Sequence, residues 1–330
     1  MLKNTATLAL SLLLVSGVLA AAPKTWTITQ VLNEGSLIAI NNSGRMIGEL
    51  RVEGTYEVRP FVWHQGNLVY LPFTPVDINE PGQVVGAMAL GAHGQVTVAV
   101  LWEHGTIVYL PMVPGYTRAF PSAINNSGQV VGWATRWLGE PPVEESVGVL
   151  WSNSSVVPLD GMRTARDIND NGQIVGTSPD GHAVLWEAGT ITRLPQPNPD
   201  AGCAALAINN RGQAVGYCDR YSTGGPHSTN GPAILWDRGT AIELLPFPDA
   251  QDNPGLAAAT AINERGQVVG FVDEFVGVWP LIWEDGGVAT QLPFPGGGTE
   301  GVRALGINNR GDIIGTSIDY GAEFGVLWTR

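Results

Sequence analysis

The sequence has few charged residues, which make up only 14% of its 330 positions. It has instead 43 Gly and 23 Pro, the two residues that disfavour helices most strongly. This composition argues against a mainly helical protein and favours short strands joined by turns.

Long hydrophobic runs are also lacking, except at the N-terminus. Lys3 precedes an apolar run over residues 5–19, and three Ala residues follow. This pattern is typical of a secretory signal peptide, and Pro23 disfavours cleavage directly before it. The run is too short to span a membrane. We expect residues 1–21 to be removed and residues 22–330 to form one exported, soluble domain without membrane insertion.

Basic residues are scarce too. Without the leader, the chain carries 16 Lys and Arg against 30 Asp and Glu, a net charge of −14. A surface this acidic repels the phosphate backbone of nucleic acids. We therefore expect no nucleic-acid partner.

Motifs of known catalytic and metal centres are absent as well. The sequence has no His-Glu-x-x-His, no Cys pair at zinc spacing and no Gly-x-Ser-x-Gly. Residues 167–172 read Asp-Ile-Asn-Asp-Asn-Gly, like the start of a calcium loop, but the twelfth position is Ser178 where such a loop has Glu. We interpret this segment as a turn, with calcium as the alternative, and predict no catalytic residues, no metal ligands and no other cofactor.

One unit is repeated seven times along the chain. Its first motif is Ile-Asn-x-x-Gly-x-x-[Ile/Val]-Gly, whose leading residues are Ile40, Ile78, Ile124, Ile168, Ile208, Ile262 and Ile307. The spacing averages about 45 residues, which is typical of a four-stranded propeller blade.

Each unit is predicted to contain four short strands. The first ends at Ile-Asn, and Asn-x-x-Gly forms a tight hairpin in which Asn bonds its own backbone and Gly supplies a positive φ. The second strand begins at the Ile/Val pair. The third ends in a second motif, at Trp63, Trp102, Trp151, Trp186, Trp236, Trp283 and Trp328. A short turn leads to the fourth strand, which a Pro commonly ends.

The seventh unit stops at Arg330, before its fourth strand. Residues 25–32 have the β-rich character of that missing strand and precede the first unit. Closure of a ring by this segment removes the exposed edge that a three-stranded sheet would leave. We therefore predict an all-β fold, a seven-bladed β-propeller of four-stranded blades closed by an N-terminal strand. An open solenoid, the alternative, would need polar capping units.

The repeated pattern resembles the HAF-repeat family of predicted extracellular proteins. Residues 182–186, His-Ala-Val-Leu-Trp, come nearest to its signature His-Ala-Phe-Leu-Trp, while copies such as Pro-Phe-Val-Trp at 60–63 depart from it. The Ile-Asn-x-x-Gly half matches throughout, so the resemblance covers nearly all of the mature chain. It implies export and repetition but no established activity, and it assigns no catalytic residues.

Alternating strand direction predicts short turns on one face of the ring and long, variable loops on the other. The long loops are expected at residues 133–147, 217–232, 247–256 and 271–280. Rigid scaffolds usually bind ligands through such variable loops. We predict that aromatic residues in or near them contact the ligand: Tyr116, Trp133, Trp137, Tyr221, Trp279 and Tyr320. The alternative is that these rings merely cover the bases of the loops.

These features favour a secreted, extracellular or periplasmic recognition scaffold. Its ligand would be a polysaccharide, a cell-envelope component or a protein, and we expect a monomer. A secreted hydrolase or lyase with its active site at the central channel is the alternative, because scattered acids can converge there without a local motif. A purely structural surface role is a third possibility.

Cys203 and Cys218 flank the hairpin of the fifth unit and are equidistant from its midpoint. They should face each other across two antiparallel strands, where opposed Cβ atoms lie about 4.5–5.5 Å apart. Because the exported protein meets an oxidising compartment, we predict a disulfide between them.

Overall fold

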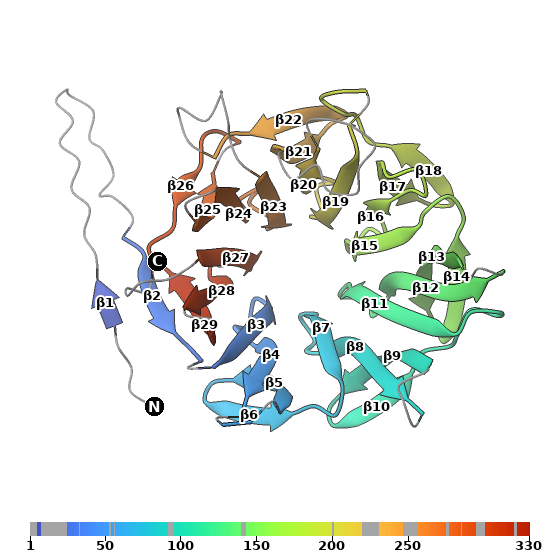
Figure 1. Cartoon of the computed structure of the whole chain (residues 1–330), viewed down its shortest axis with the longest axis horizontal. Helices are drawn as coiled ribbons and strands as arrows, with labels where there is room; N and C mark the ends of the chain where they lie inside the picture. Colours follow the sequence, from blue (N-terminus) through green and yellow to red (C-terminus); the bar gives the residue numbers. More distant parts are fainter. Residues whose placement is uncertain are drawn as a thin grey trace.

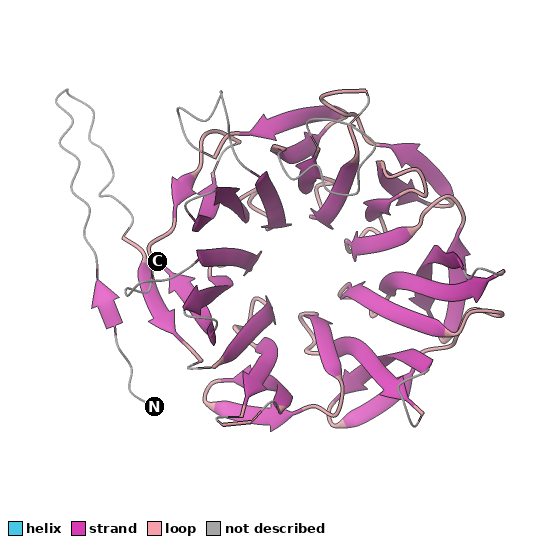
Figure 2. Ribbon diagram, viewed as in Figure 1, coloured by secondary structure: helices cyan, strands magenta, loops and turns pink. Residues whose placement is uncertain are grey.

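The computed structural model describes most of the chain beyond the expected leader. It covers residues 5–7, 25–32, 34–52, 54–55, 57–91, 96–139, 143–199, 201–219, 231–246, 256–274, 277–284, 286–294, 301–319 and 322–330. All 29 elements in these ranges are strands, as Figure 2 shows. Within the same ranges no helix is long and apolar enough to cross a membrane.

Six of the seven repeats form a group of four consecutive, antiparallel strands, and the groups stand around a common axis in Figure 1. The first three groups are β3 (Gly35–Ile40), β4 (Met46–Arg51), β5 (Val58–His64), β6 (Asn67–Tyr70); β7 (Thr74–Ile78), β8 (Val84–Leu90), β9 (Val96–Glu103), β10 (Thr106–Tyr109); and β11 (Arg118–Ile124), β12 (Val130–Leu138), β13 (Val143–Ser152), β14 (Ser155–Leu159).

The next three groups are β15 (Thr164–Ile168), β16 (Ile174–Thr177), β17 (Ala183–Glu187), β18 (Thr190–Arg193); β19 (Cys203–Ile208), β20 (Ala214–Cys218), β21 (Ala233–Asp237), β22 (Thr240–Leu244); and β23 (Leu256–Ile262), β24 (Val268–Glu274), β25 (Gly277–Trp283), β26 (Thr290–Gln291). Single parallel pairs join the second group to the third and the sixth to the seventh, at Arg118–Thr97 and Val278–Gly301. Radially arranged antiparallel sheets of this kind are the β-propeller fold.

The seventh repeat contributes β27 (Gly301–Ile307), β28 (Ile313–Asp319) and β29 (Ala322–Thr329). Strand β2 (Thr27–Gln30) pairs antiparallel with β29, in the position that the fourth strand takes in the other groups. Strand β1 (Thr5–Thr7), which belongs to the expected leader, lies on the outer edge of β2. The N-terminal segment and the C-terminus therefore meet in one sheet, as Figure 1 shows.

The Asn-x-x-Gly hairpin forms as the sequence predicts. In the second repeat the amide of Gly82 donates to the carbonyl of Asn79, and Gly82 has a φ of +90°. In five repeats the Oδ1 atom of the motif Asn accepts a hydrogen bond from the backbone amide two residues on, as Asn125 does from Ser127. The last Gly of the motif is required for a different reason, because a Cβ at Gly132 would lie 2.0 Å from the carbonyl oxygen of Phe120 on the paired strand.

The repeated Trp joins neighbouring repeats. Trp328 is fully buried, and its Nε1 donates to the carbonyl oxygen of Pro293 at the end of the preceding repeat. Trp151 and Trp236 make the same bond to Pro111 and Pro195. The core thus lies between the sheets, and the Trp of the second sequence motif is bonded to the preceding repeat in the third, fifth, sixth and seventh repeats.

The connections that follow β4 and β6, and their counterparts in the other repeats, lie at one end of the ring, here called the loop face. Two of the predicted long loops on this face are largely strand. Residues 133–138 and 143–147 extend β12 and β13, and residues 271–274 and 277–280 belong to β24 and β25. The loop prediction for these segments is therefore wrong, because their alternating side chains continue the ladder beyond the shared motif. The loops predicted at 217–232 and 247–256 fall mostly outside the described residues.

The predicted disulfide between Cys203 and Cys218 is confirmed. The two residues are direct partners in the β19–β20 register, with Cα atoms 4.1 Å apart. Beside the bridge, the amide of Asp219 donates to the carbonyl of Gly202, and the amide of Cys218 donates to that of Pro232. The bridge therefore fixes the base of the connection between β20 and β21.

We expect replacement of both cysteines by Ser to lower the free energy of unfolding by about 3 kcal/mol at most, because the bond closes a loop of 15 residues. The melting profile should shift but stay cooperative. Chemical denaturation of the variant and alkylation followed by mass spectrometry check this. Two alkylatable thiols in the unreduced wild-type protein would show that the bond does not form.

Candidate functional site

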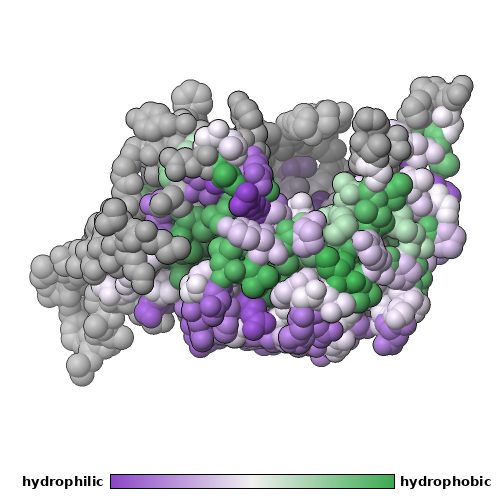
Figure 3. Space-filling view, turned by 90° about the horizontal axis from the view of Figure 1, so that it is seen from below, coloured by the Kyte–Doolittle hydropathy of each residue, from purple (hydrophilic) through white to green (hydrophobic). Residues whose placement is uncertain are grey.

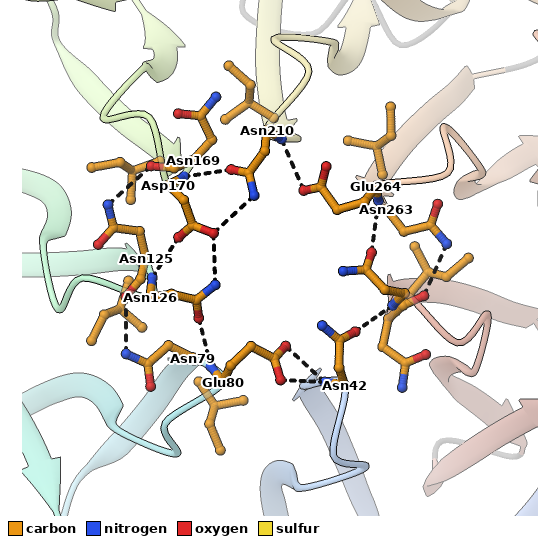
Figure 4. Close-up of a pocket in the computed structure, with 18 of the residues that line it drawn as sticks. Asn42, Asn79, Glu80, Asn125, Asn126, Asn169, Asp170, Asn210, Asn263 and Glu264 are labelled. Carbon is orange, nitrogen blue, oxygen red and sulfur yellow. Dashed lines mark hydrogen bonds between the residues drawn. The ribbon is translucent and has the colours of Figure 1, made fainter.

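A continuous ring of hydrogen bonds surrounds the axis at the end opposite the loop face (Figure 4). In every repeat the Nδ2 group of the motif Asn donates to the backbone carbonyl of the matching Asn in the next repeat, over 3.0–3.2 Å. The last of these bonds runs from Asn308 back to Asn41. All seven Asn side chains are buried: Asn41, Asn79, Asn125, Asn169, Asn209, Asn263 and Asn308.

A second ring is formed by the residue after each motif Asn. The backbone amide of each member donates to a side-chain oxygen of the next, over 2.6–3.1 Å. Amide and carboxylate side chains alternate, in the order Asn42, Glu80, Asn126, Asp170, Asn210, Glu264 and Asn309. Two amide side chains are adjacent only where the seventh repeat meets the first.

The two rings enclose a polar cavity of about 280 Å³ on the axis. Most side-chain oxygens around it are already used between repeats. Burial raises the pKa of Asp170, but hydrogen bonds from Asn126 and Asn210 outweigh this effect, and its pKa lies below the ordinary value. We interpret the hydrogen bonds of the two rings mainly as interactions that stabilise the packing of neighbouring repeats. Among the described residues, no group of three or more His, Cys, Asp or Glu is placed to hold a metal ion.

Two half-buried carboxylates, here called the deep acids, lie inside the ring, one residue before the motif Ile. Asp77 accepts hydrogen bonds from the amides of Ile78 and, in the next repeat, Ile124. Asp167 likewise accepts from Ile168 and Ile208. Burial, with the charge of Asp167 as a smaller cause, raises the pKa of Asp77 from 3.8 to about 7. Burial raises that of Asp167 to about 6.

The other five repeats provide an internal comparison for these acids. The same position is Ala in four of them and Gly in one: Ala39, Ala123, Ala207, Ala261 and Gly306. The fold therefore forms around this position without a carboxylate. Deep acids with pKa values near neutrality can exchange protons at physiological pH, which is the property that acid–base catalysis requires.

The calcium-like segment at residues 167–172 has the hairpin of the other repeats. Its Gly172 has a φ of +79°, and the amide of Gly172 donates to the carbonyl of Asn169. Both carboxylates of the segment are engaged in hydrogen bonds to neighbouring repeats. This supports the turn interpretation, since the hairpin needs no ion to explain it.

Four of the six predicted ligand-binding residues are described, and they do not form one cluster. Trp133 is half-buried, stacked on Phe120 at 5.4 Å with Arg166 over its ring. Tyr116 is half-buried under Arg136, 4.7 Å from the guanidinium to the ring centroid. These two rings therefore pack mainly against their own sheets.

Trp279 is also half-buried, with its ring edge-to-face against Phe294 at 5.1 Å. Its Nε1 is buried without a hydrogen-bond acceptor in the described structure. Tyr221 and Tyr320 lie outside the described residues. Of the four described residues, only Trp137 has a largely exposed ring, at 54%.

Trp137 lies near the tip of the hairpin that has the most strand pairs among the described residues of the loop face. The β12–β13 register has nine pairs, from Val130–Trp151 to Leu138–Val143. The matching hairpin of the fourth repeat starts at the same motif position and has only four pairs. Five additional pairs extend the hairpin of the third repeat by about 16 Å, at about 3.3 Å per residue.

The extended hairpin is braced near its tip. Arg136 and Glu145, which are direct partners, form an ion pair of 2.7 Å, and Glu145 also accepts from the hydroxyl of Tyr116. Leu138 and Val143 beyond this pair are 46% and 66% exposed. The hairpin therefore presents an indole and two aliphatic side chains on a supported strand pair.

Sequence reasoning missed the inter-repeat rings and the two deep acids. Both features are nevertheless visible as patterns in the sequence. Asp precedes Ile-Asn in only the second and fourth repeats, and the residue after Ile-Asn alternates between amide and acid along most of the chain. The strand prediction depends only on what the repeats share, so these departures did not contribute to it.

No family model matches the chain, and no curated protein matches it either. Solved structures do. The β-propeller domain of the trilobed protease from Pyrococcus furiosus, described as having an open velcro topology, is 10% identical over 90% of this chain and 94% of that chain, with a TM-score of 0.60. Virginiamycin B lyase from Staphylococcus aureus is 12% identical over 92% and 99%, with a TM-score of 0.52.

The acylaminoacyl peptidase of Pyrococcus horikoshii is 10% identical over 88% of this chain and 52% of that chain, with a TM-score of 0.56. At such identities these similarities concern the fold alone. They agree with the β-propeller architecture described above.

Proposed function

We propose that the protein is a secreted recognition scaffold that binds a polysaccharide, cell-envelope component or protein through its loop face. The observation that carries this proposal is the exposed indole of Trp137 on the extended β12–β13 hairpin. An indole left in solvent adds little to the stability of its own fold. Exposed aromatic rings stack on sugar faces and fill pockets of protein partners.

The surroundings of Trp137 support this role. The Arg136–Glu145 ion pair and the Tyr116 ring hold the hairpin from one side, so that binding orders few side chains. A rigid aromatic anchor costs less conformational entropy on binding than a flexible one.

Replacing Trp137 by Ala is expected to weaken binding of the mature protein to a cell-envelope fraction at least tenfold. The loss corresponds to about 1.4 kcal/mol, within the usual range for an aromatic interface anchor. Co-sedimentation with the fraction measures it. His64→Ala, at the turn between β5 and β6 on the opposite face, is the matched control and should bind like wild type. Equal binding by all three proteins would contradict the assignment of the face.

A hydrolase or lyase with its active site near the axis is the second candidate. Asp77 and Asp167 favour it, because they have pKa values near neutrality at a position where five repeats have Ala or Gly. Solved structures of similar fold include a peptidase and a lyase, although at their low sequence identity the similarity concerns the fold alone. Turnover of a glycan or peptide that Asp77→Asn abolishes would favour this candidate over the scaffold.

We further propose that the propeller has seven blades and that β2 closes it. Each blade corresponds to one sequence repeat. Support comes from the pairing of β2 with β29 and from the hydrogen bond of Asn308 to Asn41, which link the ends of the chain. Trp26, just before β2, is buried, and the guanidinium of Arg330 lies 3.9 Å from its ring centroid. We also propose that the chain is related to the HAF-repeat proteins that its repeats resemble, and that it is exported from the cell.

A further inference from the structure

We propose that a groove between the first and second repeats binds a neutral oligosaccharide, with Tyr70 and Tyr109 as stacking platforms. This rests on the proposed recognition function and gives it a ligand class and a site. The groove has a volume of about 480 Å³ and opens at the loop-face ends of the strands. Val58 and Pro60 of the first repeat and Thr74 and Met88 of the second line it.

Both Tyr residues are exposed: Tyr70 lines this groove, and Tyr109 contacts one of its lining residues. Tyr70 is 54% exposed. Tyr109 is 57% exposed, and its hydroxyl donates to the Sδ of Met88 on the groove wall over 3.7 Å. Figure 3, which views the molecule from the side where these repeats lie in Figure 1, shows hydrophobic patches among hydrophilic ones on this side of the molecule.

The repeats themselves show that these aromatic side chains are not required by the fold. Tyr70 is paired with Phe61, and Tyr109 with Val100, two positions before the motif Trp. The residue at the same register position in the other five repeats is Pro or a hydrophilic residue: Pro158, Arg193, Glu243, Gln291 and Gln30. Only two adjacent repeats, which share the groove, have an aromatic ring there.

An exposed polar pair lies beside the first ring. The Nε of Arg59 donates to Glu57 over 2.8 Å, and its guanidinium lies 5.8 Å from the centroid of the Tyr70 ring. Both residues line the groove. Together they offer N–H donors and a carboxylate acceptor next to flat aromatic surface, which is the combination that recognises the hydroxyl groups and the apolar face of a sugar.

Charge selects a neutral ligand. The Arg59–Glu57 pair cancels itself, so the groove has no excess charge of its own. The mature chain around it carries a net charge of −14, which disfavours an acidic polymer. An uncharged oligosaccharide is not repelled by this negative charge. Two aromatic platforms on adjacent repeats suit an extended chain of sugar units.

The test uses the mature protein on an array of neutral cello-, chito-, manno- and xylo-oligosaccharides, followed by calorimetry with the bound member. Wild type is expected to bind, and Tyr70→Gln and Tyr109→Gln are each expected to raise the Kd at least tenfold. Gln stands at this position in two other repeats, so both variants should fold. Glu243→Gln, at the equivalent position of the fifth repeat, is the matched control and should not change the Kd.

The proposal is overturned if no neutral oligosaccharide binds, or if both Tyr variants bind like wild type. A protein ligand whose capture depends on Tyr70 would also overturn it, because the occupant would then be of another class. Loss of envelope binding in Trp137→Ala together with unchanged binding in the Tyr variants would leave the recognition scaffold in place and reject the groove alone.

Discussion

A mature protein that lacks residues 22–32 is expected to aggregate or to lose cooperative unfolding. The deletion removes Trp26 and Ile28, which are buried against Val326 and Trp328 in one cluster. Loss of a buried Trp alone typically costs about 3–5 kcal/mol, a large part of the stability of an ordinary domain. It also exposes the whole edge of β29, and unpaired strand edges promote association between molecules.

Calorimetry and size-exclusion chromatography of the deletion variant measure both effects. Trp26→Ala and Ile28→Ala separate the lost packing from the exposed edge: these variants should be less stable but remain monomeric. The ring bonds from Asn308 and Asn309 to the first repeat stay available, so the remaining repeats can still approach one another. A deletion variant that melts like the intact protein would refute closure by β2.

The second large effect is expected from replacing both deep acids, Asp77 and Asp167, by Asn. In wild type the folded pKa values, about 7 and about 6, exceed the ordinary value of 3.8. Between these limits the folded protein holds more protons than the unfolded chain, so its stability falls as pH rises from about 4 to about 7. The neutral Asn side chains remove this dependence.

Each unit of pKa shift corresponds to about 1.4 kcal/mol. Because both side chains keep some accessible surface, we discount the full shifts by about half. As the pH rises from 4 to 8, the free energy of unfolding of the double variant is then expected to increase by about 3–4 kcal/mol relative to that of wild type. Denaturation curves at a series of pH values measure the difference. Asp160→Asn, in an exposed turn, is the control; parallel pH profiles of wild type and double variant would show that the two acids are not responsible.

Much of the architecture was predictable because it is local and repeated. Hairpins such as that of Asn79 and Gly82 follow from backbone preferences of a few neighbouring residues. Seven copies of one pattern average out the ambiguity of any single strand. The pairing of Cys203 with Cys218 was predictable for the same reason, since hairpin register depends only on the position of the turn.

The candidate sites were less predictable. An exposed ring and a buried one have the same letter in the sequence, and Trp133, Trp137 and Trp279 differ only in what the neighbouring strands place over them. The prediction of one aromatic binding cluster treated them as equivalent. The groove at Tyr70 was missed because it combines side chains from two repeats, and nothing in one repeat indicates how its neighbour is oriented.

The sequence by itself determined the all-β class, the repeat length, the hairpins and the disulfide, because each depends on residues close together in the chain. Only the tertiary structure decided which polar groups meet across repeats and which aromatic rings remain open. The bond from Asn308 to Asn41 joins residues 267 positions apart, and the deep position of Asp77 depends on the backbone of Ile124 in the next repeat. Such contacts arise from the packing of whole sheets around the axis, where the geometry of the ring sets the distances and burial that give each side chain its chemistry.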